Sequence, residues 1–408
     1  MNVVILNHYP PVLVDYAEWL SDFVDTFTLI IPEKYKEYFD SKNGYNSVIT
    51  LKNYFNDNEL SEVISEVNSE EKITHIISIS EKDTQRAALL REYYGIRGQK
   101  MLSATLYRNK FWMKRKVADS GFLVPSFKLV HNTDEIINFI RKYNYPIILK
   151  PISEADSIGV VKINEEKELV ALDIEYPMLV EEYIECKNMY SIDGVVINGN
   201  PALIVAHKYH DKPMENQNKT SLIIVEQLLP GDPMSLRLVE YQKRLLKEIP
   251  HEAKAYCFHT EVFHTLNDKI IFCETASRLA GARIPQLIKL SYDIDLEGLN
   301  IQTQLGIRNG FPINSRQMPE KKVYSILLPK KLGKVVSIPD EKEIPFNWVV
   351  SFSPLIRINE VISEKNGSTD VASFLIISLD IHEDLNIKLR ELQTYLDESI
   401  VYEKICSS

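Results

Sequence analysis

Short apolar runs alternate with helix-like patterns over roughly the first hundred residues. Continuous apolar runs predict buried parallel strands, and apolar residues spaced three or four apart predict helices between them. The predicted strands are 3–6, 27–31 and 73–79, and the predicted helices are 15–24, 60–67 and 83–94. This alternation predicts an open α/β layer.

Two nucleotide-binding classes are excluded by missing glycine motifs. The segment after the first predicted strand, Asn7-His8-Tyr9-Pro10-Pro11, contains no glycine. A dinucleotide-binding dehydrogenase needs a glycine-rich turn at this point, so we exclude that class. The chain also lacks GxxxxGKS and GxxxxGKT, which excludes a P-loop protein.

Lysines mark the pattern that follows the first hundred residues. A helix is predicted at 107–120 with Lys110 near its start, and an apolar strand then ends on Lys150, just before a proline. The next loop, 153–159 (SEADSIG), is small and polar. A lysine at a strand end beside such a loop can hold phosphate, because backbone N–H groups and the ammonium both point at the anion. A plain hairpin loop with a surface lysine remains the alternative at this stage.

Another apolar strand, 178–180, runs into the acidic pair Glu181 and Glu182, followed by Tyr183 and Ile184. A carboxylate at this strand end could accept a hydrogen bond from an adenine amino group, with backbone groups contacting the ring nitrogens. A strand end that reaches solvent would produce the same pattern, so both interpretations stay open here.

Two β-branched and aromatic segments, 260–265 and 269–275, separated by a turn signal predict a β-hairpin, which we call the acid hairpin. The turn signal is Asn267-Asp268, because Asn and Asp tolerate the left-handed backbone of a tight turn. With a two-residue loop at these positions, we expect Phe263 to face Phe272 on the opposite strand.

The same register places Glu261 directly opposite Glu274. Like charges in such a pair are destabilising, and a divalent cation would offset them, since Mg²⁺ prefers carboxylate oxygens. Arg278 and Arg283 follow the hairpin. Two acids followed by two cations predict a site that binds anions and metal together; a solvated ribbon with two surface acids is the alternative.

Beyond Pro312 the pattern changes to short strands followed by a final helix. The predicted strands are 323–328, 333–336, 348–352 and 372–379, and the predicted helix is 383–396. This succession predicts a small α+β domain from about residue 320.

Length, charge and cysteine content limit the number of domains, the partners and the cellular compartment that we expect. A chain of 408 residues is long enough for two or three domains. Its net charge of -10 argues against a nucleic-acid partner. The four cysteines show no metal-binding spacing, and the sequence has neither a signal-peptide pattern nor a run long enough to span a membrane. We therefore expect a cytoplasmic protein without a membrane partner.

The order of these signals resembles the ATP-grasp superfamily over about 105–310, and most closely its L-amino-acid ligase branch of carboxylate–amine ligases. The resemblance implies an α/β and α+β multidomain chain with an ATP-grasp fold. Its expected parts are an N-terminal open α/β domain (1–102), an ATP-grasp nucleotide-binding and catalytic region (103–319) and a C-terminal α+β domain (320–408).

The resemblance also implies roles for individual residues. The implied nucleotide-binding residues are Lys110, Lys150, Ser157, Ile158, Gly159, Glu181, Glu182, Tyr183 and Ile184. Glu261 and Glu274 match the metal ligands, Lys150 and Arg278 the catalytic cations, and Arg278 with Arg283 the substrate-binding residues. Two positions depart from the family pattern: Ala276 stands where an asparagine metal ligand is common, and Asn188 where a ribose-binding glutamate is common.

The implied activity is ATP-dependent ligation with Mg²⁺ or Mn²⁺. An amino acid, or another carboxylate, would be activated as an acyl-phosphate and joined to an amine, releasing ADP and phosphate. Two alternatives stay open: loading of an amino acid onto a carrier-protein thiol, and a non-catalytic ATP-binding regulatory protein. A homodimer is a further expectation from the resemblance.

Overall fold

The computed structural model describes residues 1–45, 47–210, 222–306, 321–363 and 371–404. The N-terminal part is an open, parallel four-stranded sheet with strand order β3-β2-β1-β4. Its elements are β1 (Val3–Leu6), η1 (Pro11–Leu13), α1 (Tyr16–Leu20), β2 (Thr28–Pro32), η2 (Glu33–Tyr35), α2 (Lys36–Asp40), β3 (Ser47–Leu51), α3 (Asp57–Glu70), β4 (His75–Ser78), η3 (Glu81–Asp83) and α4 (Thr84–Tyr93). All four residues of β1 are buried, as expected for a central parallel strand.

Strand β3 is absent from the sequence prediction. It lies at the edge of the sheet, and four of its five residues are only partly buried. Because it lacks the continuous apolar run of a central strand, its sequence does not stand out from the surrounding loop.

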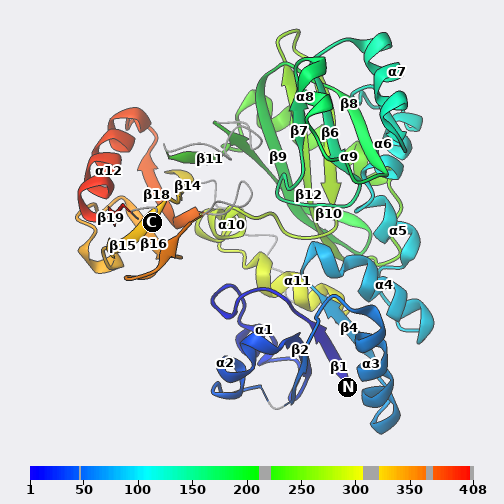
Figure 1. Cartoon of the computed structure of the whole chain (residues 1–408). Helices are drawn as coiled ribbons and strands as arrows, with labels where there is room; N and C mark the ends of the chain where they lie inside the picture. Colours follow the sequence, from blue (N-terminus) through cyan, green and yellow to red (C-terminus); the bar gives the residue numbers. More distant parts are fainter. Residues whose placement is uncertain (46, 211–221, 307–320, 364–370, 405–408) are drawn as a thin grey trace.

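A small antiparallel sheet and a set of short helices follow (Figure 1). The strand order is β5-β8-β6-β7, so the strands that end at Lys150 and Glu181 are direct neighbours. The elements are α5 (Met101–Leu106), α6 (Lys110–Asp119), β5 (Phe127–Val130), α7 (Thr133–Tyr143), β6 (Ile147–Pro151), β7 (Val161–Ile163), α8 (Glu166–Val170) and β8 (Met178–Glu182). The helix predicted at 107–120 corresponds to α6, with Lys110 in its first position, and the short helix α5 before it was not predicted.

The large sheet has eight strands in the order β13-β12-β9-β10-β11-β14-β18-β16, all paired antiparallel. Its first strands and the neighbouring helices are β9 (Cys186–Ile197), β10 (Asn200–Tyr209), β11 (Ile223–Gln227), α9 (Pro233–Glu248), β12 (Tyr256–Thr265), β13 (Ile270–Ala276), α10 (Ile284–Tyr292) and α11 (Leu296–Gln304). The acid hairpin is β12–β13, at one edge of this sheet.

The C-terminal part contributes the remaining strands and helix α12. These are β14 (Lys321–Pro329), β15 (Gly333–Ser337), η5 (Glu341–Glu343), β16 (Val349–Pro354), β17 (Val361–Ile362), β18 (Val371–Asp380), α12 (Leu385–Ser399) and β19 (Val401–Glu403). Strands β17-β15-β19 form a separate small sheet. Strand β14 pairs with β11, so the large sheet includes strands from both sides of residue 320. The domain boundary predicted at residue 320 therefore stays a prediction.

Helix α11 joins the N-terminal sheet to the rest of the molecule. Ile301 and Leu305 pack in the same core cluster as Val3 and Tyr16. Gln304 accepts a hydrogen bond from the backbone N–H of Ser78 at 3.1 Å, and its Nε2 donates to the carbonyl of the same residue at 2.9 Å. The end of β4 is thereby tied to α11, which lies beside the N-terminal sheet in Figure 1. No helix among the described residues is long and apolar enough to cross a membrane.

The buried His251 makes stability depend on pH. Its ring stacks on Tyr256 with the centroids 3.7 Å apart, and burial lowers the pKa of His251 to about 4. Between pH 6.5 and 4 the unfolded chain binds a proton that the folded chain does not, so stability falls as the pH falls. The expected contribution is a loss of about 2 kcal/mol by pH 5, which His251→Phe should remove. Urea unfolding of both proteins at pH 7 and pH 5 measures it; an equal loss in the variant contradicts the assignment.

Candidate active site

Two cavities meet at the loop 153–159. The smaller, of about 120 Å³, is bounded by the ends of β6 and β8 on one side and by the acid hairpin on the other. The larger, of about 310 Å³, lies among the N-terminal domain, the segment that follows β13, and Phe374 of β18. Ala155 and Asp156 line both cavities, so this loop forms the boundary between them.

The smaller cavity collects most of the residues predicted to bind nucleotide and metal. Those that line it are Lys110, Lys150, Ser157, Glu181, Glu182, Tyr183, Ile184, Glu261 and Glu274. The structure does not place Ile158, Gly159 or Asn188 in its lining. Ile158 is 45% exposed, and Gly159 has φ +70° and packs against Pro151, where an added Cβ would approach within 2.8 Å.

Glu181 is the centre of a buried lysine cluster. Its Oε2 lies 3.0 Å from Lys150 Nζ and its Oε1 lies 3.3 Å from Lys114 Nζ. Lys114 is fully buried and also donates to the backbone carbonyl of Cys273 at 2.5 Å. The carboxylate predicted to read adenine is therefore held by two ammonium groups, and its contact with the base stays a prediction.

The charges of this cluster are set by burial and by the neighbouring side chains. Burial lowers the pKa of Lys114. Burial would also lower the pKa of Lys150, but Glu181 together with Cys273 and Glu274 raises it above the ordinary value. Burial would raise the pKa of Glu181, but Lys114 and Lys150 hold it below the ordinary value. Burial opposes ionisation of Glu274 as well, yet Lys110 and the other lysines lower the pKa of Glu274 to about 2. Both glutamates are thus anionic at neutral pH.

The predicted register of the acid hairpin is right at the acids and wrong nearer the loop. Glu261 pairs with Glu274, as predicted, but Phe263 pairs with Ile271 instead of Phe272.

Two deviations from the predicted hairpin lie between the loop and the paired acids, and their effects on the strand register cancel. The loop has three residues, 266–268, because Thr265 N–H bonds to the carbonyl of Lys269 and Asp268 takes the left-handed φ of 58°. A bulge between Glu261 and Val262 then shifts the register back by one residue.

Glu261 is oriented by a buried polar network. Its Oε1 accepts a hydrogen bond from the Tyr209 hydroxyl at 3.0 Å and lies 3.6 Å from His259 Nε2. The other ring nitrogen of His259 lies 2.7 Å from Asp193, which also contacts His207 at 2.8 Å. Burial works against the charged ring, but Asp193 and Glu261 together raise the pKa of His259 to about 10.

The donor set of the acid hairpin fits a hard divalent cation. Glu261 and Glu274 supply carboxylate oxygens from opposite positions of two paired strands. Ala276, two residues after Glu274, is buried and brings no ligand atom. Among the described residues there is no group of three or more His, Cys, Asp and Glu suited to a metal ion. The protein therefore offers two carboxylate ligands, and phosphate oxygens and water would complete the shell.

Restoring the missing ligand is expected to strengthen metal binding. Ala276→Asn adds an amide oxygen two residues after Glu274, and one further ligand worth about 1.4 kcal/mol would lower the Kd for Mn²⁺ roughly tenfold. Mn²⁺ titration followed by electron paramagnetic resonance, with an ATP analogue present, measures the change. Ala276→Leu has a similar volume without the oxygen and should not tighten binding. Equal Kd values in the asparagine variant and the wild type would contradict the prediction.

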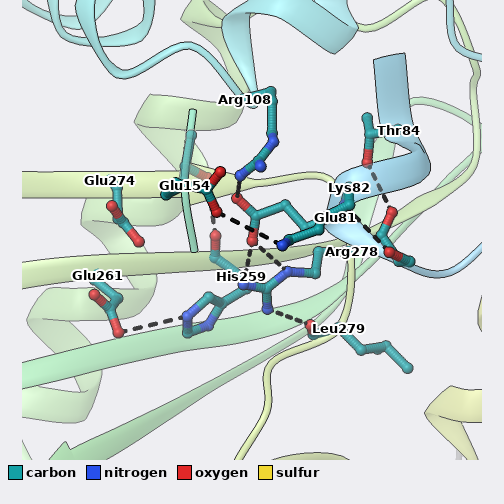
Figure 2. A network of polar contacts seen from close by, with 12 residues as sticks. Glu81, Lys82, Thr84, Arg108, Glu154, His259, Glu261, Glu274, Arg278 and Leu279 are labelled. Atoms are coloured by element: carbon teal, nitrogen blue, oxygen red, sulfur yellow. Dashed lines mark hydrogen bonds and ion pairs between the residues drawn. The ribbon is translucent and has the colours of Figure 1, made fainter. Parts of the chain in front are cut away.

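Arg278 sits at the wall of the larger cavity and is fixed by the protein itself (Figure 2). Its Nε and Nη2 donate to Glu81 Oε2 at 2.8 and 2.5 Å, and its Nη1 donates to the carbonyl of Leu279 at 2.6 Å. The second oxygen of Glu81 accepts from Arg108 at 2.6 Å. Beside this group, Lys82 Nζ lies 3.7 Å from Glu154 of the 153–159 loop.

Arg283 also lines the larger cavity. It adopts a left-handed φ of 59° immediately before helix α10, and its guanidinium lies 5.3 Å from the ring centroid of Phe374. Burial lowers the pKa of Arg283 and raises the pKa of Glu297, which lines the same cavity. The larger cavity thus contains cationic, anionic and aromatic groups, a combination suited to a small zwitterion.

Sequence reasoning missed three parts of this arrangement: Lys114, Glu81 and Asp193. Lys114 has a local signal, since it lies four residues after Lys110 and therefore on the same face of α6. Glu81 has none, because it is 197 residues away from Arg278 in the chain. Asp193 lies inside a strand whose other residues are mostly apolar and is recognisable only once β9 is paired with β12.

Comparisons with known proteins agree with this architecture. Residues 107–212 match the family of the RimK-like ATP-grasp domain. The L-arginine-specific L-amino acid ligase of Bacillus subtilis is 24% identical over 344 residues, which is 79% of each chain. The D-alanine–D-alanine ligase of Campylobacter concisus is 28% identical over 134 residues, 31% of this chain and 37% of that ligase. The L-amino acid ligase structure from Bacillus licheniformis superposes with a TM-score of 0.74 at 16% identity, covering 99% of both chains.

The match over residues 107–212 and the superposition over the whole chain agree on the ATP-grasp fold, which confirms the predicted fold class. The predicted resemblance within that fold is confirmed as well, since the homologues are amino-acid ligases and the chain is similar to L-amino acid ligases over most of its length.

Proposed function

We propose that this protein is an ATP-dependent, ADP-forming ligase that activates the carboxylate of an amino acid and joins it to an amine. One observation supports this above all. Two facing carboxylates, Glu261 and Glu274, line the same small cavity as Lys110 and Lys150, and this cavity adjoins the larger one that holds Arg278. Such an arrangement suits transfer of a phosphoryl group from one cavity to the other.

The nucleotide would occupy the smaller cavity. Lys150 and Lys110 would neutralise phosphate oxygens, and Tyr183 and Ile184 would border the base. Glu261 and Glu274 would hold Mg²⁺ or Mn²⁺, which supplies charge neutralisation for the phosphates when bound. The loop 153–159, which lines both cavities, would cover the reacting groups and exclude water.

The reaction then has two transfers. The substrate carboxylate oxygen attacks the γ-phosphorus of ATP, the bond to the β-phosphate oxygen breaks, and ADP leaves. The amine nitrogen attacks the acyl carbon of the resulting acyl-phosphate, and the carbon–oxygen bond to phosphate breaks. Products are ADP, inorganic phosphate and an amide, with the proton of the amine released. Arg278 would stabilise the negative charge of the acyl-phosphate and of both transition states.

The larger cavity supports amino acids as the substrates. Its volume of about 310 Å³ suits one or two small molecules. Its walls combine the apolar Trp19 and Phe374 with Arg283 and Glu297, which could pair with a carboxylate and an ammonium group respectively. The names of the homologous ligases point to the same substrate class.

A substrate-pool experiment tests the proposal. The protein is mixed with MgATP and the common amino acids, singly and in pairs, while phosphate release is followed and products are identified by mass spectrometry. The expected result is ADP and phosphate together with a dipeptide mass equal to two amino acids less one water. Production of AMP and pyrophosphate would refute the acyl-phosphate route. Phosphate release only after a carrier protein is added would indicate a thiol acceptor, and nucleotide binding without turnover in any pool would indicate a non-catalytic protein.

A further inference from the structure

We propose that Glu81, from the N-terminal domain, is a positioning residue that orients Arg278 for catalysis. The inference rests on the proposed ligase function and extends it, because it makes the N-terminal domain part of the catalytic machinery. Glu81 lies in the turn η3, directly after the carboxyl end of strand β4. Arg278 lies two residues beyond the end of β13, a strand of a different sheet.

The contact between Glu81 and Arg278 is buried and well defined. The Glu81 side chain is 12% exposed and that of Arg278 is 15% exposed. One Glu81 oxygen accepts two hydrogen bonds from Arg278, from Nε and from Nη2, so the guanidinium cannot rotate without breaking both. The other oxygen accepts from Arg108, whose side chain is 7% exposed. Figure 2 shows Glu81 between the two arginines.

The donor count of Arg278 leaves room for a substrate. A guanidinium has five N–H donors. Two of them bond to Glu81 and a third bonds to the Leu279 carbonyl. The remaining two, one on each terminal nitrogen, take no part in these three bonds and would serve an anion in the larger cavity, which Arg278 lines. Glu81 therefore determines which edge of the guanidinium is presented to the acyl-phosphate.

The charges of Glu81, Arg278 and Arg108 favour an orienting role for Glu81 over simple neutralisation of Arg278. Burial would raise the pKa of Glu81, but Arg278 and Arg108 together lower it, so the carboxylate is ionised at neutral pH. Two guanidinium groups and one carboxylate leave one positive charge in the group. An orienting carboxylate that still leaves a net positive charge prepares the site for an anion, and pre-orientation avoids reorganisation during the reaction.

A double-mutant cycle between Glu81 and Arg278 tests the inference. Glu81→Gln, Arg278→Lys and the double variant are compared for kcat, for KM of ATP and for thermal stability, in the full-length protein. Glu81→Gln keeps the size of the side chain but loses its charge; we expect kcat to fall roughly 30- to 100-fold with KM for ATP changed less than about threefold. In the Arg278→Lys background, Glu81→Gln should lower kcat less than about threefold further, because its effect passes through Arg278.

Asp83→Asn is the matched control. Asp83 is a fully buried carboxylate two residues from Glu81, and it pairs with Arg86 at 2.7 Å within the N-terminal domain. It should lower thermal stability as much as Glu81→Gln does, with kcat retained within about threefold. Glu81→Asp, which keeps the charge, should recover part of the lost kcat and covers the case in which Glu81→Gln folds poorly.

The outcomes separate this inference from the proposed function. Full additivity of the two substitutions, or an equal loss of kcat in Asp83→Asn, would overturn the positioning role while leaving ligase activity in place. Absence of ligase turnover in the wild type with every amino-acid pool would overturn the proposed function, and the positioning role with it.

Discussion

Replacing Lys150 with methionine (K150M) is expected to reduce kcat for ATP-dependent ligation by roughly 10²- to 10³-fold, the range typical for loss of one charge-stabilising donor. Lys150 is the penultimate residue of strand β6 and is buried, and it lines the smaller cavity together with Glu261 and Glu274. Burial would lower the pKa of Lys150, but Glu181 together with Cys273 and Glu274 raises it above the ordinary value, so the side chain is charged at neutral pH. Methionine has a similar length and apolar character but no charge.

The loss should affect the chemical step more than folding. Lys114 still pairs with Glu181 in the variant, so that buried carboxylate keeps one partner. Single-turnover rates with saturating MgATP measure the effect on chemistry. Lys128→Met removes a lysine from β5 of the same small sheet, where it pairs with Glu135 on the surface, and should leave the rate unchanged. A K150M rate within threefold of the wild type would show that Lys150 does not serve phosphoryl transfer.

The second large effect is expected at the acid hairpin. Glu274→Gln should reduce turnover by roughly 10²- to 10⁴-fold, since a metal that neutralises phosphates is worth several kcal/mol and each 1.4 kcal/mol is tenfold. Although burial opposes ionisation, Lys110 and the other nearby lysines lower the pKa of Glu274 to about 2, so the wild-type carboxylate is ionised throughout the neutral range. A glutamine keeps one carbonyl oxygen but removes the charge that offsets the nearby lysines. Glu261→Gln should act in the same direction.

Metal titrations distinguish loss of a ligand from general damage to the site. In both variants the Mg²⁺ concentration needed for half-maximal rate should rise, and EDTA should abolish the activity of the wild type. Glu226→Gln is the control, because Glu226 lies in β11 of the same sheet and pairs with His210 at 2.9 Å, outside both cavities. If Glu274→Gln retains its rate and its Mg²⁺ requirement, the two acids of the hairpin are not metal ligands.

In the acid hairpin, the prediction that the two acids face each other was right because two errors in the predicted register cancelled. Alternation of side chains along two strands indicates which residues share a face. Which residues face each other across the hairpin depends on the length of the loop. The loop is one residue longer than Asn267-Asp268 predicts, and the bulge next to Glu261 restores the register. A bulge depends on the neighbouring strand as well as on the hairpin, and β12 is also paired with β9 on its other side. The sequence of the hairpin alone does not reveal it.

Four charged residues of the smaller cavity were predictable because their signal is local. Lys150, Glu181, Glu261 and Glu274 interrupt apolar or β-branched runs at positions where a buried strand meets a cavity, and the structure brings all four to one cavity. Their chemistry follows from residue type alone: ammonium groups bind phosphate, and paired carboxylates bind a hard cation. Their roles with a nucleotide and a metal remain predictions that the variants above test.

The sequence by itself therefore indicated the fold class, through the family resemblance that the order of its signals carries, and the charged residues that meet in the smaller cavity, because strand patterns and the residues that interrupt them are properties of short segments. Tertiary structure alone decided which residues support that site. Glu81 meets Arg278 across 197 residues, and Lys114 meets Glu181 because α6 packs against the neighbouring strands. Such contacts depend on how sheets and domains pack against one another, and no local spacing encodes that packing.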